Sequence, residues 1–329
     1  MYLTRWLHVR RIWRVAMMPM FLIATALVSL GPVTNGSNLT AMGRLSGQSA
    51  TPKLSNLVGS LAQENTNASL SLANPCPPPP AGTGNSGTWT CTKAWSGYMV
   101  TSDTFDQVEG NWNVQCPGSG NGPGYFESTW IGIGGNNQSY LVQVGTTYAG
   151  DPDANIPFAY YPFWEYATGS TTTGSTYIDT YAPLSCTTSI AAHISKNSSN
   201  QWCTSITWGG TYNYTQCFSS SDQPSQTTAE WVDERPTCNG GYPWLYNFNY
   251  TSFSNAYAHS IYRGWHTIGG YPRDQIGMYY YSGGANGVYV NMAYPNNLPS
   301  GDTTFRDNFQ KPGLGQDCTV TGQPYYDYQ

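Results

Sequence analysis

The chain has 329 residues, of which only 9% are charged, and its formal net charge at pH 7 is −5. From residue 75 onward it holds 7 Lys and Arg against 17 Asp and Glu, which argues against nucleic-acid binding because that function needs clustered basic side chains. With 36 Gly, 26 Tyr and 12 Trp and no sustained 3.6-residue apolar period after about residue 35, the sequence predicts an all-β protein.

The N-terminus has the pattern of a secretory signal. Four arginines fall within the first 14 residues, and an apolar run from Val15 to Leu30 follows them. A basic region followed by an apolar run of this length predicts a signal peptide over residues 1–34 and a secreted, extracellular protein. The alternative is an uncleaved membrane anchor, although a membrane span needs roughly 20 apolar residues. If the signal is removed, we expect no stable membrane association.

Residues 35–88 differ in composition from the rest of the chain. They lack aromatic residues until the end of the Pro-rich stretch NPCPPPPAGTGNSG, Asn74–Gly87, which predicts a stiff linker. We interpret residues 35–88 as a pro-segment with this linker, removed on acidification, and residues 89–329 as one β-domain. A disordered spacer is the alternative interpretation of the segment before the linker.

Cysteine and histidine usage favours disulfides over metal binding. An even number of cysteines in an exported chain indicates disulfide pairing, without indicating which cysteines pair. These cysteines are Cys76, Cys91, Cys116, Cys186, Cys203, Cys217, Cys238 and Cys318. With only 4 His and no zinc-binding motif, we predict no metal and no cofactor. N-glycosylation sequons occur at Asn137, Asn197, Asn213 and Asn249, and matter only if the source glycosylates.

Three segments alternate with the two-residue period of a strand: STWIGIGG, SYLVQVGTTY and AEWVDERP. Within each segment the two faces differ: Ile131 and Ile133 lie opposite Trp130, Val142 and Val144 lie opposite Gln143, and Glu230, Val232 and Glu234 lie opposite Trp231, Asp233 and Arg235. This alternation predicts antiparallel sheets over a core. We therefore expect a sandwich of two antiparallel sheets, of the concanavalin-like or jelly-roll type, whose non-core face curves into a groove.

The acids of AEWVDERP invite comparison with a glycosidase carboxyl pair. Glu230 and Glu234 share a face, but four residues of strand separate them by about 13 Å, which is longer than either glycosidase geometry. Asp233 is on the opposite face, where we expect it to pair with Arg235 at the strand end. A pairing across strands keeps a carbohydrate-binding or carbohydrate-cleaving protein open as the alternative function.

Five segments in order carry a resemblance to a known family: AWSGYMVTSDTFDQVEGNWNVQCP, STWIGIGG, LVQVGTTY, FWEY and AEWVDERP, from Trp95 to Pro236. Together they resemble the glutamic peptidases, or eqolisins. The resemblance implies a two-sheet sandwich and an acid-acting endopeptidase with a Gln/Glu dyad. Departures include Gly134 where the family has Asp, and Asp233 where it has an apolar core residue.

Carried over by motif, the resemblance places the dyad on Gln143 and Glu234. It makes Trp130 a substrate-binding residue, and we expect Glu165 and Glu230 to be substrate-binding as well. A Glu can take a proton from water and return it to the leaving amine, while a Gln donates to the oxyanion without adding charge. The expected partners are polypeptide substrates of a monomeric enzyme. A non-catalytic surface or adhesion protein of the same fold is the third hypothesis.

Overall fold

The computed structural model describes residues 76–81, 83, 87–121, 124–136, 140–151, 156–168, 171–172, 176–178, 183–219, 223–236, 241–282, 288–299 and 301–315. Within these ranges the regular structure is strand apart from one 3-10 turn, so the predicted all-β class is confirmed. No helix in these ranges is long and apolar enough to cross a membrane. The predicted signal and residues 35–75 lie outside the described residues.

The first strands along the chain are β1 Thr88–Thr92, β2 Trp95–Val100, β3 Phe105–Asn113, β4 Tyr125–Gly134, β5 Tyr140–Asp151, β6 Ile156–Thr168, β7 Thr171–Thr172, β8 Thr176–Tyr177 and β9 Ser189–Lys196. They are followed by β10 Trp202–Trp208, β11 Tyr212–Phe218, β12 Ala229–Glu234, β13 Trp244–Leu245, β14 Tyr250–Ser260, β15 Gly264–Thr267, η1 Ile268–Gly270, β16 Arg273–Tyr281, β17 Tyr289–Pro295 and β18 Phe305–Phe309.

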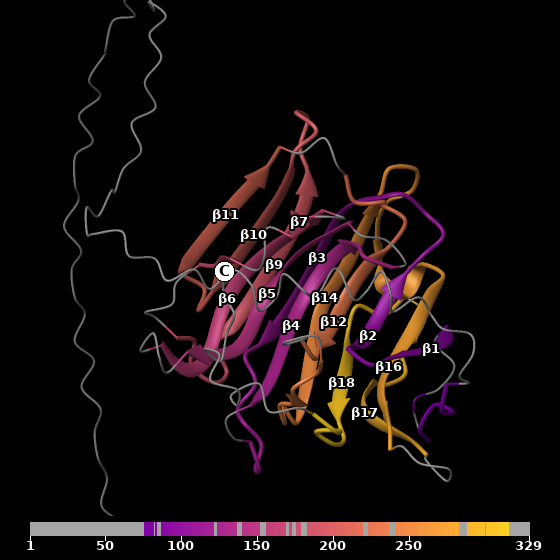
Figure 1. Ribbon diagram of the computed structural model, residues 1–329. Coiled ribbons are helices and arrows are strands. Elements are labelled where there is room, and N and C mark those ends of the chain that lie inside the picture. Colours follow the sequence, from indigo (N-terminus) through magenta and orange to yellow (C-terminus); the bar gives the residue numbers. More distant parts are fainter. Residues whose placement is uncertain are drawn as a thin grey trace, which may run out of the picture. The chain divides into compact units, whose positions relative to one another are not determined.

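The strands form two layers (Figure 1). The first, here called the site sheet, has the order β1-β16-β2-β12-β4-β5-β6, antiparallel except between β1 and β16. The second, the back sheet, has the antiparallel order β11-β10-β9-β3-β14-β15. Strands β17 and β18 connect β16 to the start of β14 and so join the layers along one side. The predicted sandwich of two antiparallel sheets is confirmed.

The core lies between the sheets and follows from the alternation of the strands. Ile131, Val144 and Trp231 of the site sheet and Val108 and Ile194 of the back sheet are fully buried in one apolar cluster. Burying each large apolar side chain stabilises the fold by about 1.5–3 kcal/mol. The Trp231 indole N–H also donates to a back-sheet carbonyl. The opposite, outer face of the site sheet is therefore left to the residues of even number in β12 and β4.

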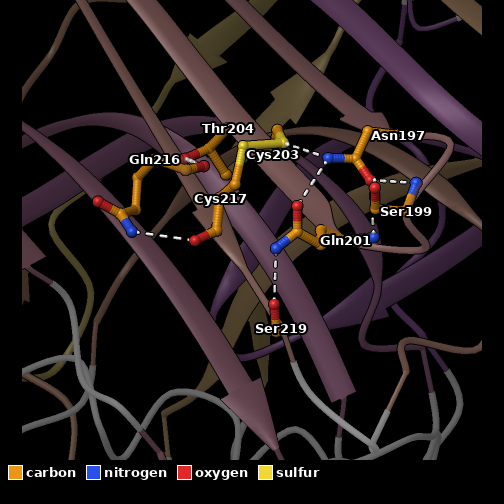
Figure 2. Close-up of a disulfide and its surroundings, with 8 residues drawn as sticks. All are labelled: Asn197, Ser199, Gln201, Cys203, Thr204, Gln216, Cys217 and Ser219. Atoms are coloured by element: carbon orange, nitrogen blue, oxygen red, sulfur yellow. Dashed lines mark hydrogen bonds between the residues drawn. A yellow bond between two sulfur atoms is a disulfide. The ribbon is translucent and has the colours of Figure 1, made fainter. Parts of the chain in front are cut away.

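One disulfide joins neighbouring strands of the back sheet. Cys203 on β10 and Cys217 on β11 are paired in register, with Cα atoms 4.0 Å apart (Figure 2). Beside it, the Asn197 side chain donates to Gln201 Oε1 at 2.9 Å and to Cys203 Sγ at 3.7 Å. The disulfide thus fastens the outermost strand β11 to the sheet.

A second disulfide, Cys76–Cys91, ties the Pro-rich segment to β1. The Trp89 indole donates to the Pro77 carbonyl at 2.9 Å, and Gln275 donates to the Thr83 carbonyl at 3.1 Å. The described part of this segment is therefore attached to the β-domain at three points.

The other cysteines divide into two groups. Cys116 and Cys186 are free and exposed, and a hydrogen bond between the two thiols raises the pKa of Cys186. Cys238 and Cys318 lie outside the described residues. The prediction of disulfides is therefore confirmed for two pairs, whereas these two neighbouring thiols are not bonded.

Three carboxyl groups lie fully buried between the sheets: Glu127 on β4, Asp233 on β12 and Asp307 on β18, here called the core acid cluster. Asp233 Oδ1 accepts hydrogen bonds from Thr129 at 2.6 Å and Thr251 at 2.9 Å. Asp307 Oδ1 accepts one from Ser96 at 2.7 Å. Burial raises the pKa of Asp307 to about 7 and raises those of Glu127 and Asp233 well above their ordinary values.

The hydrogen bonds around Thr129 favour a proton within this cluster. Its hydroxyl lies within hydrogen-bond distance of both Glu127 and Asp233. A hydroxyl group has one proton to donate, so it cannot fully satisfy both carboxylates, and protonation of one of the two acids would relieve this arrangement. The two ion pairs found among the described residues, His259–Asp106 and Arg263–Asp103, do not involve the cluster. Burial therefore favours the protonated, uncharged form of the acids in the core acid cluster.

Candidate functional site

All five predicted site residues lie on the outer face of the site sheet, and all are buried. The strand register explains which of them are neighbours. Gly132 on β4 pairs with Glu230 on one side and with Gln143 on the other. Gln143 pairs in turn with Glu165 on β6. Glu165, Gln143, Gly132 and Glu230 therefore form one row across four adjacent strands.

Glu234 is held by two indole groups. Trp95 Nε1 donates to Glu234 Oε1 at 2.8 Å, and Trp130 Nε1 donates to Glu234 Oε2 at 2.7 Å. The two rings pack edge to face with centroids 5.1 Å apart. Burial raises the pKa of Glu234 to about 7, while the two indole hydrogen bonds act in the opposite direction. Both carboxylate oxygens are thereby fixed in place.

Gln143 is oriented by Glu165. Its Nε2 donates to Glu165 Oε2 at 2.7 Å, whereas its Oε1 is buried and has no hydrogen-bond partner among the described residues. Since the amide nitrogen faces the carboxyl group, the carbonyl oxygen points to the other side of the amide plane. The Gln143 side chain thus has a fixed orientation and an unused acceptor.

Trp130 occupies the centre of the site. A Cβ atom placed on Gly132 would lie 2.6 Å from Cζ3 of the Trp130 ring. The ring therefore covers Gly132, between the strands that carry Gln143 and Glu230, and its indole nitrogen reaches Glu234. Any side chain at position 132 would displace the ring, so the glycine is required for this packing.

The structure separates the two predicted dyad residues into different rows of the sheet. Gln143 pairs with Gly132, whereas Glu234 pairs with Ser128, four residues away along β4. Their hydrogen bonds go to different partners, Glu165 for Gln143 and the two indoles for Glu234. The Trp130 side chain connects the two rows.

Trp95 is a site residue that the sequence analysis missed. It belongs to the AWSGYMV segment that carried the resemblance, but nothing local shows that its indole reaches Glu234, 139 residues away. The available signal was its position: Trp95 is on the same face of β2 as Met99, and both lie in the apolar cluster that contains Trp130 and Val232.

The predicted pairing of Asp233 with Arg235 is wrong. Asp233 is bound by the hydroxyls of Thr129 and Thr251 in the core. Arg235 donates instead to the main-chain carbonyls of Pro243 and Leu314, each at 2.5 Å. Both groups find partners on other segments, so sharing a face of β12 does not bring them together.

The outer face of the site sheet is covered in this structure. An apolar cluster that includes Trp95, Leu141, Phe163 and Ile276 surrounds Trp130, and Glu234 is 1% exposed. A cavity of about 860 Å³ lies elsewhere, lined by residues of the back sheet and of the β17–β18 connection such as Asn111 and Asn297. Glu234 is therefore shielded from solvent among apolar side chains of the site sheet.

Comparisons with known proteins place the site within a recognised segment. A sequence model described as the Peptidase A4 family matches residues 93–271. Solved structures similar to this chain include scytalido-glutamic peptidase with a peptide-based transition state analog, at 17% identity over 66% of this chain and 98% of that chain, with a TM-score of 0.49. Another is SCP-B, a member of the eqolisin family of peptidases, in complex with the tripeptide Ala-Ile-His, at 16% identity, the same coverage and a TM-score of 0.47. No curated protein matches.

Proposed function

Because the match to residues 93–271 spans more than half of its length, the chain belongs to the Peptidase A4 family of glutamic peptidases, and we propose that it is a secreted endopeptidase that cuts polypeptides in acid with Gln143 and Glu234 as its dyad. The family match is to peptidases and gives the carbohydrate alternative no support. Two disulfides agree with an extracellular protein.

In the proposed mechanism Glu234 is the general base. As water attacks the scissile carbonyl carbon, Glu234 takes one proton from it, and then returns this proton to the leaving amine nitrogen when the C–N bond breaks. Burial favours the protonated form of Glu234. Entry of the attacking water rehydrates the carboxyl group and lowers its pKa toward the ordinary value of 4.5, which extends base action into mild acid.

Gln143 is proposed to stabilise the oxyanion that forms from the scissile carbonyl and to position the attacking water. Its amide is neutral at every pH, so Nε2 can donate to the developing oxyanion and Oε1 can accept from the attacking water. The hydrogen bond to Glu165 supports this role because it sets the amide orientation before substrate binds. Trp130 and Glu165 would then contact the substrate or the groups that position it.

The observation that carries this proposal is the carboxyl group of Glu234, held by two indole N–H groups on the sheet face that also presents Gln143. Such a group is fixed, sheltered from solvent and uncharged in acid until water enters. These properties suit a base that must act only on a bound water molecule.

The test is casein hydrolysis in mild acid by the purified protein and by Glu234→Gln. We expect the parent to cut casein with metal chelators and with serine- or cysteine-directed inhibitors present. Removal of the base should reduce turnover by roughly 10²–10⁴-fold. Glu109→Gln, on the back sheet, is the matched control and should retain turnover. Full activity of Glu234→Gln, with circular dichroism showing both variants folded, would overturn the assignment.

A further inference from the structure

Glu230 is a buried acid whose hydrogen bonding is incomplete among the described residues. Its side chain is 0% exposed, the Thr228 hydroxyl interacts with its carboxyl group, and no other hydrogen-bond partner for either oxygen is found among the described residues. By contrast, both oxygens of Glu234, four residues along the same strand, are bound by indoles. A buried polar group that lacks a partner is costly to the fold, so its retention on this face points to a ligand that satisfies it.

The surroundings of Glu230 favour its uncharged form. Strands β2, β4, β5, β6 and β12 contain no Lys, Arg or His. The titratable groups of the described strands that share the face include Glu165, Tyr161, Glu234 and Asp274, of which Asp274 pairs with Met99 next to Glu230. All of these are acids, and burial raises the pKa of Glu230 well above its ordinary value.

An uncharged carboxyl group matches the hydrogen-bonding pattern of a peptide unit. It offers one O–H donor for a carbonyl and one oxygen acceptor for an N–H. Gln143, in the same row of the sheet, offers a second unused acceptor on the other side of Gly132. The Trp130 ring covers Gly132 between them, so Glu230 and Gln143 offer hydrogen-bonding groups to a peptide on opposite sides of this ring.

We propose that Glu230 is a substrate-binding residue, which holds a main-chain peptide unit of the substrate through hydrogen bonds from an uncharged carboxyl group. This inference rests on the proposed function and assigns to Glu230 a task different from that of Glu234. Ionisation of Glu230 would set an upper pH limit on substrate binding, because the ionised carboxylate has lost its O–H donor and repels the peptide carbonyl.

The experiment measures peptide binding without cleavage. In the Glu234→Gln background the dissociation constant of an internally quenched fluorescent peptide, one that the parent cuts, is measured at pH 4 by fluorescence anisotropy. Adding Glu230→Leu removes both hydrogen bonds at similar volume and should weaken binding by roughly 10- to 100-fold. Adding Glu230→Gln, which keeps a donor and an acceptor, should restore most of the affinity.

The pH dependence of peptide affinity distinguishes substrate binding by Glu230 from a purely structural role, which would not change that dependence. Between pH 4 and the onset of unfolding, the single variant Glu234→Gln should lose affinity for the peptide as pH rises. The double variant Glu234→Gln with Glu230→Gln should not. Equal dissociation constants for Glu230→Leu and its background, with both proteins folded, would overturn the inference. Continued cleavage by Glu234→Gln would instead overturn the proposed dyad, so the two failures are distinguishable.

Discussion

Strand β12 carries buried acids on both of its faces, and the acids on the two faces have different hydrogen-bond partners. On the outer face, Glu234 receives two indole hydrogen bonds, whereas Glu230 has only the Thr228 hydroxyl nearby among the described residues. On the core face, Asp233 is bound by two threonine hydroxyls within the core acid cluster. Burial raises the pKa of all three groups.

The difference lies in how water reaches each acid. The acids of the outer face lie among apolar side chains of one sheet face, where the proposed function requires a substrate and its attacking water to bind, so these acids would be rehydrated and could ionise in the folded protein. The core acid cluster lies between two packed sheets, so its acids can be hydrated only when the sheets separate. The same property, a raised pKa, should therefore govern activity on one face and stability on the other.

The largest expected effect is loss of the fold as pH rises. The pKa of Asp307 is about 7 in the folded protein against an ordinary value of 3.8. Because the folded value is the higher one, its stabilising contribution is complete below about pH 4 and is lost as pH rises to about 7. The loss is on the order of 4 kcal/mol for one such group. Unfolding midpoints in urea, measured from pH 3 to 7, should fall steeply.

Two variants sharpen this comparison between the faces. Asp233→Asn removes one acid from the core acid cluster but keeps an acceptor for Thr129 and Thr251, so unfolding should begin at a higher pH than in the parent. Glu234→Gln removes an outer-face acid whose folded pKa of about 7 lies closer to its ordinary value of 4.5, so it should move the unfolding pH less. Equal shifts in the two variants would show that the faces do not differ.

The second effect concerns activity alone. Gln143→Ala removes the proposed oxyanion donor and should lower kcat by on the order of 10²–10³-fold at every pH. Gln143→Glu should lose a comparable amount, because the new carboxyl group would face Glu165 at the present 2.7 Å hydrogen bond and the pair would have to share a proton. Neither change touches the core acid cluster. Turnover against pH, with urea midpoints alongside, should show lost activity and a parental unfolding pH.

The smallest expected effect is on the pH dependence of activity, and it tests the hydrogen bonds from Trp95 and Trp130 to Glu234. Trp95→Phe removes the donor to Glu234 Oε1 while Trp130 still binds Oε2. Loss of a hydrogen bond to the charged form raises the pKa of Glu234, so the acid side of the kcat/KM profile should shift to higher pH, with about tenfold lower activity in acid. Trp89→Phe is the matched control, since that indole bonds the Pro77 carbonyl instead. An unshifted profile for Trp95→Phe would refute the role of the indole.

Local alternation was enough to place most of the site. The two-residue period placed Trp130 opposite Ile131 and Ile133, Gln143 opposite Val142 and Val144, and Glu230 and Glu234 opposite Trp231; the structure agrees and adds that these strands share one outer face. These assignments depend only on strand geometry and on the need to bury apolar side chains, which the sequence displays directly.

Contacts between distant segments could not be obtained in this way. Trp95 reaches Glu234 because β2 pairs with β12, and Asp233 meets Thr251 because β14 packs against its face. Periodicity gives the face of a residue but not what the opposing layer offers, which is why the pairing of Asp233 with Arg235 failed. It also cannot show that Trp130 lies over Gly132, since that depends on a rotamer.

Because of the Cys76–Cys91 disulfide, the product of any proteolytic maturation of this chain depends on whether the cut lies before or after Cys76. A cut before Cys76 would release the preceding peptide as a free fragment. A cut between Cys76 and Cys91 would leave a two-chain molecule, in which a short N-terminal peptide stays covalently tethered to β1. Under non-reducing conditions that form would have the mass of the uncut segment, and reduction would then set the peptide free. A removed pro-segment and a retained light chain are therefore distinguished by which side of a single cysteine is cut.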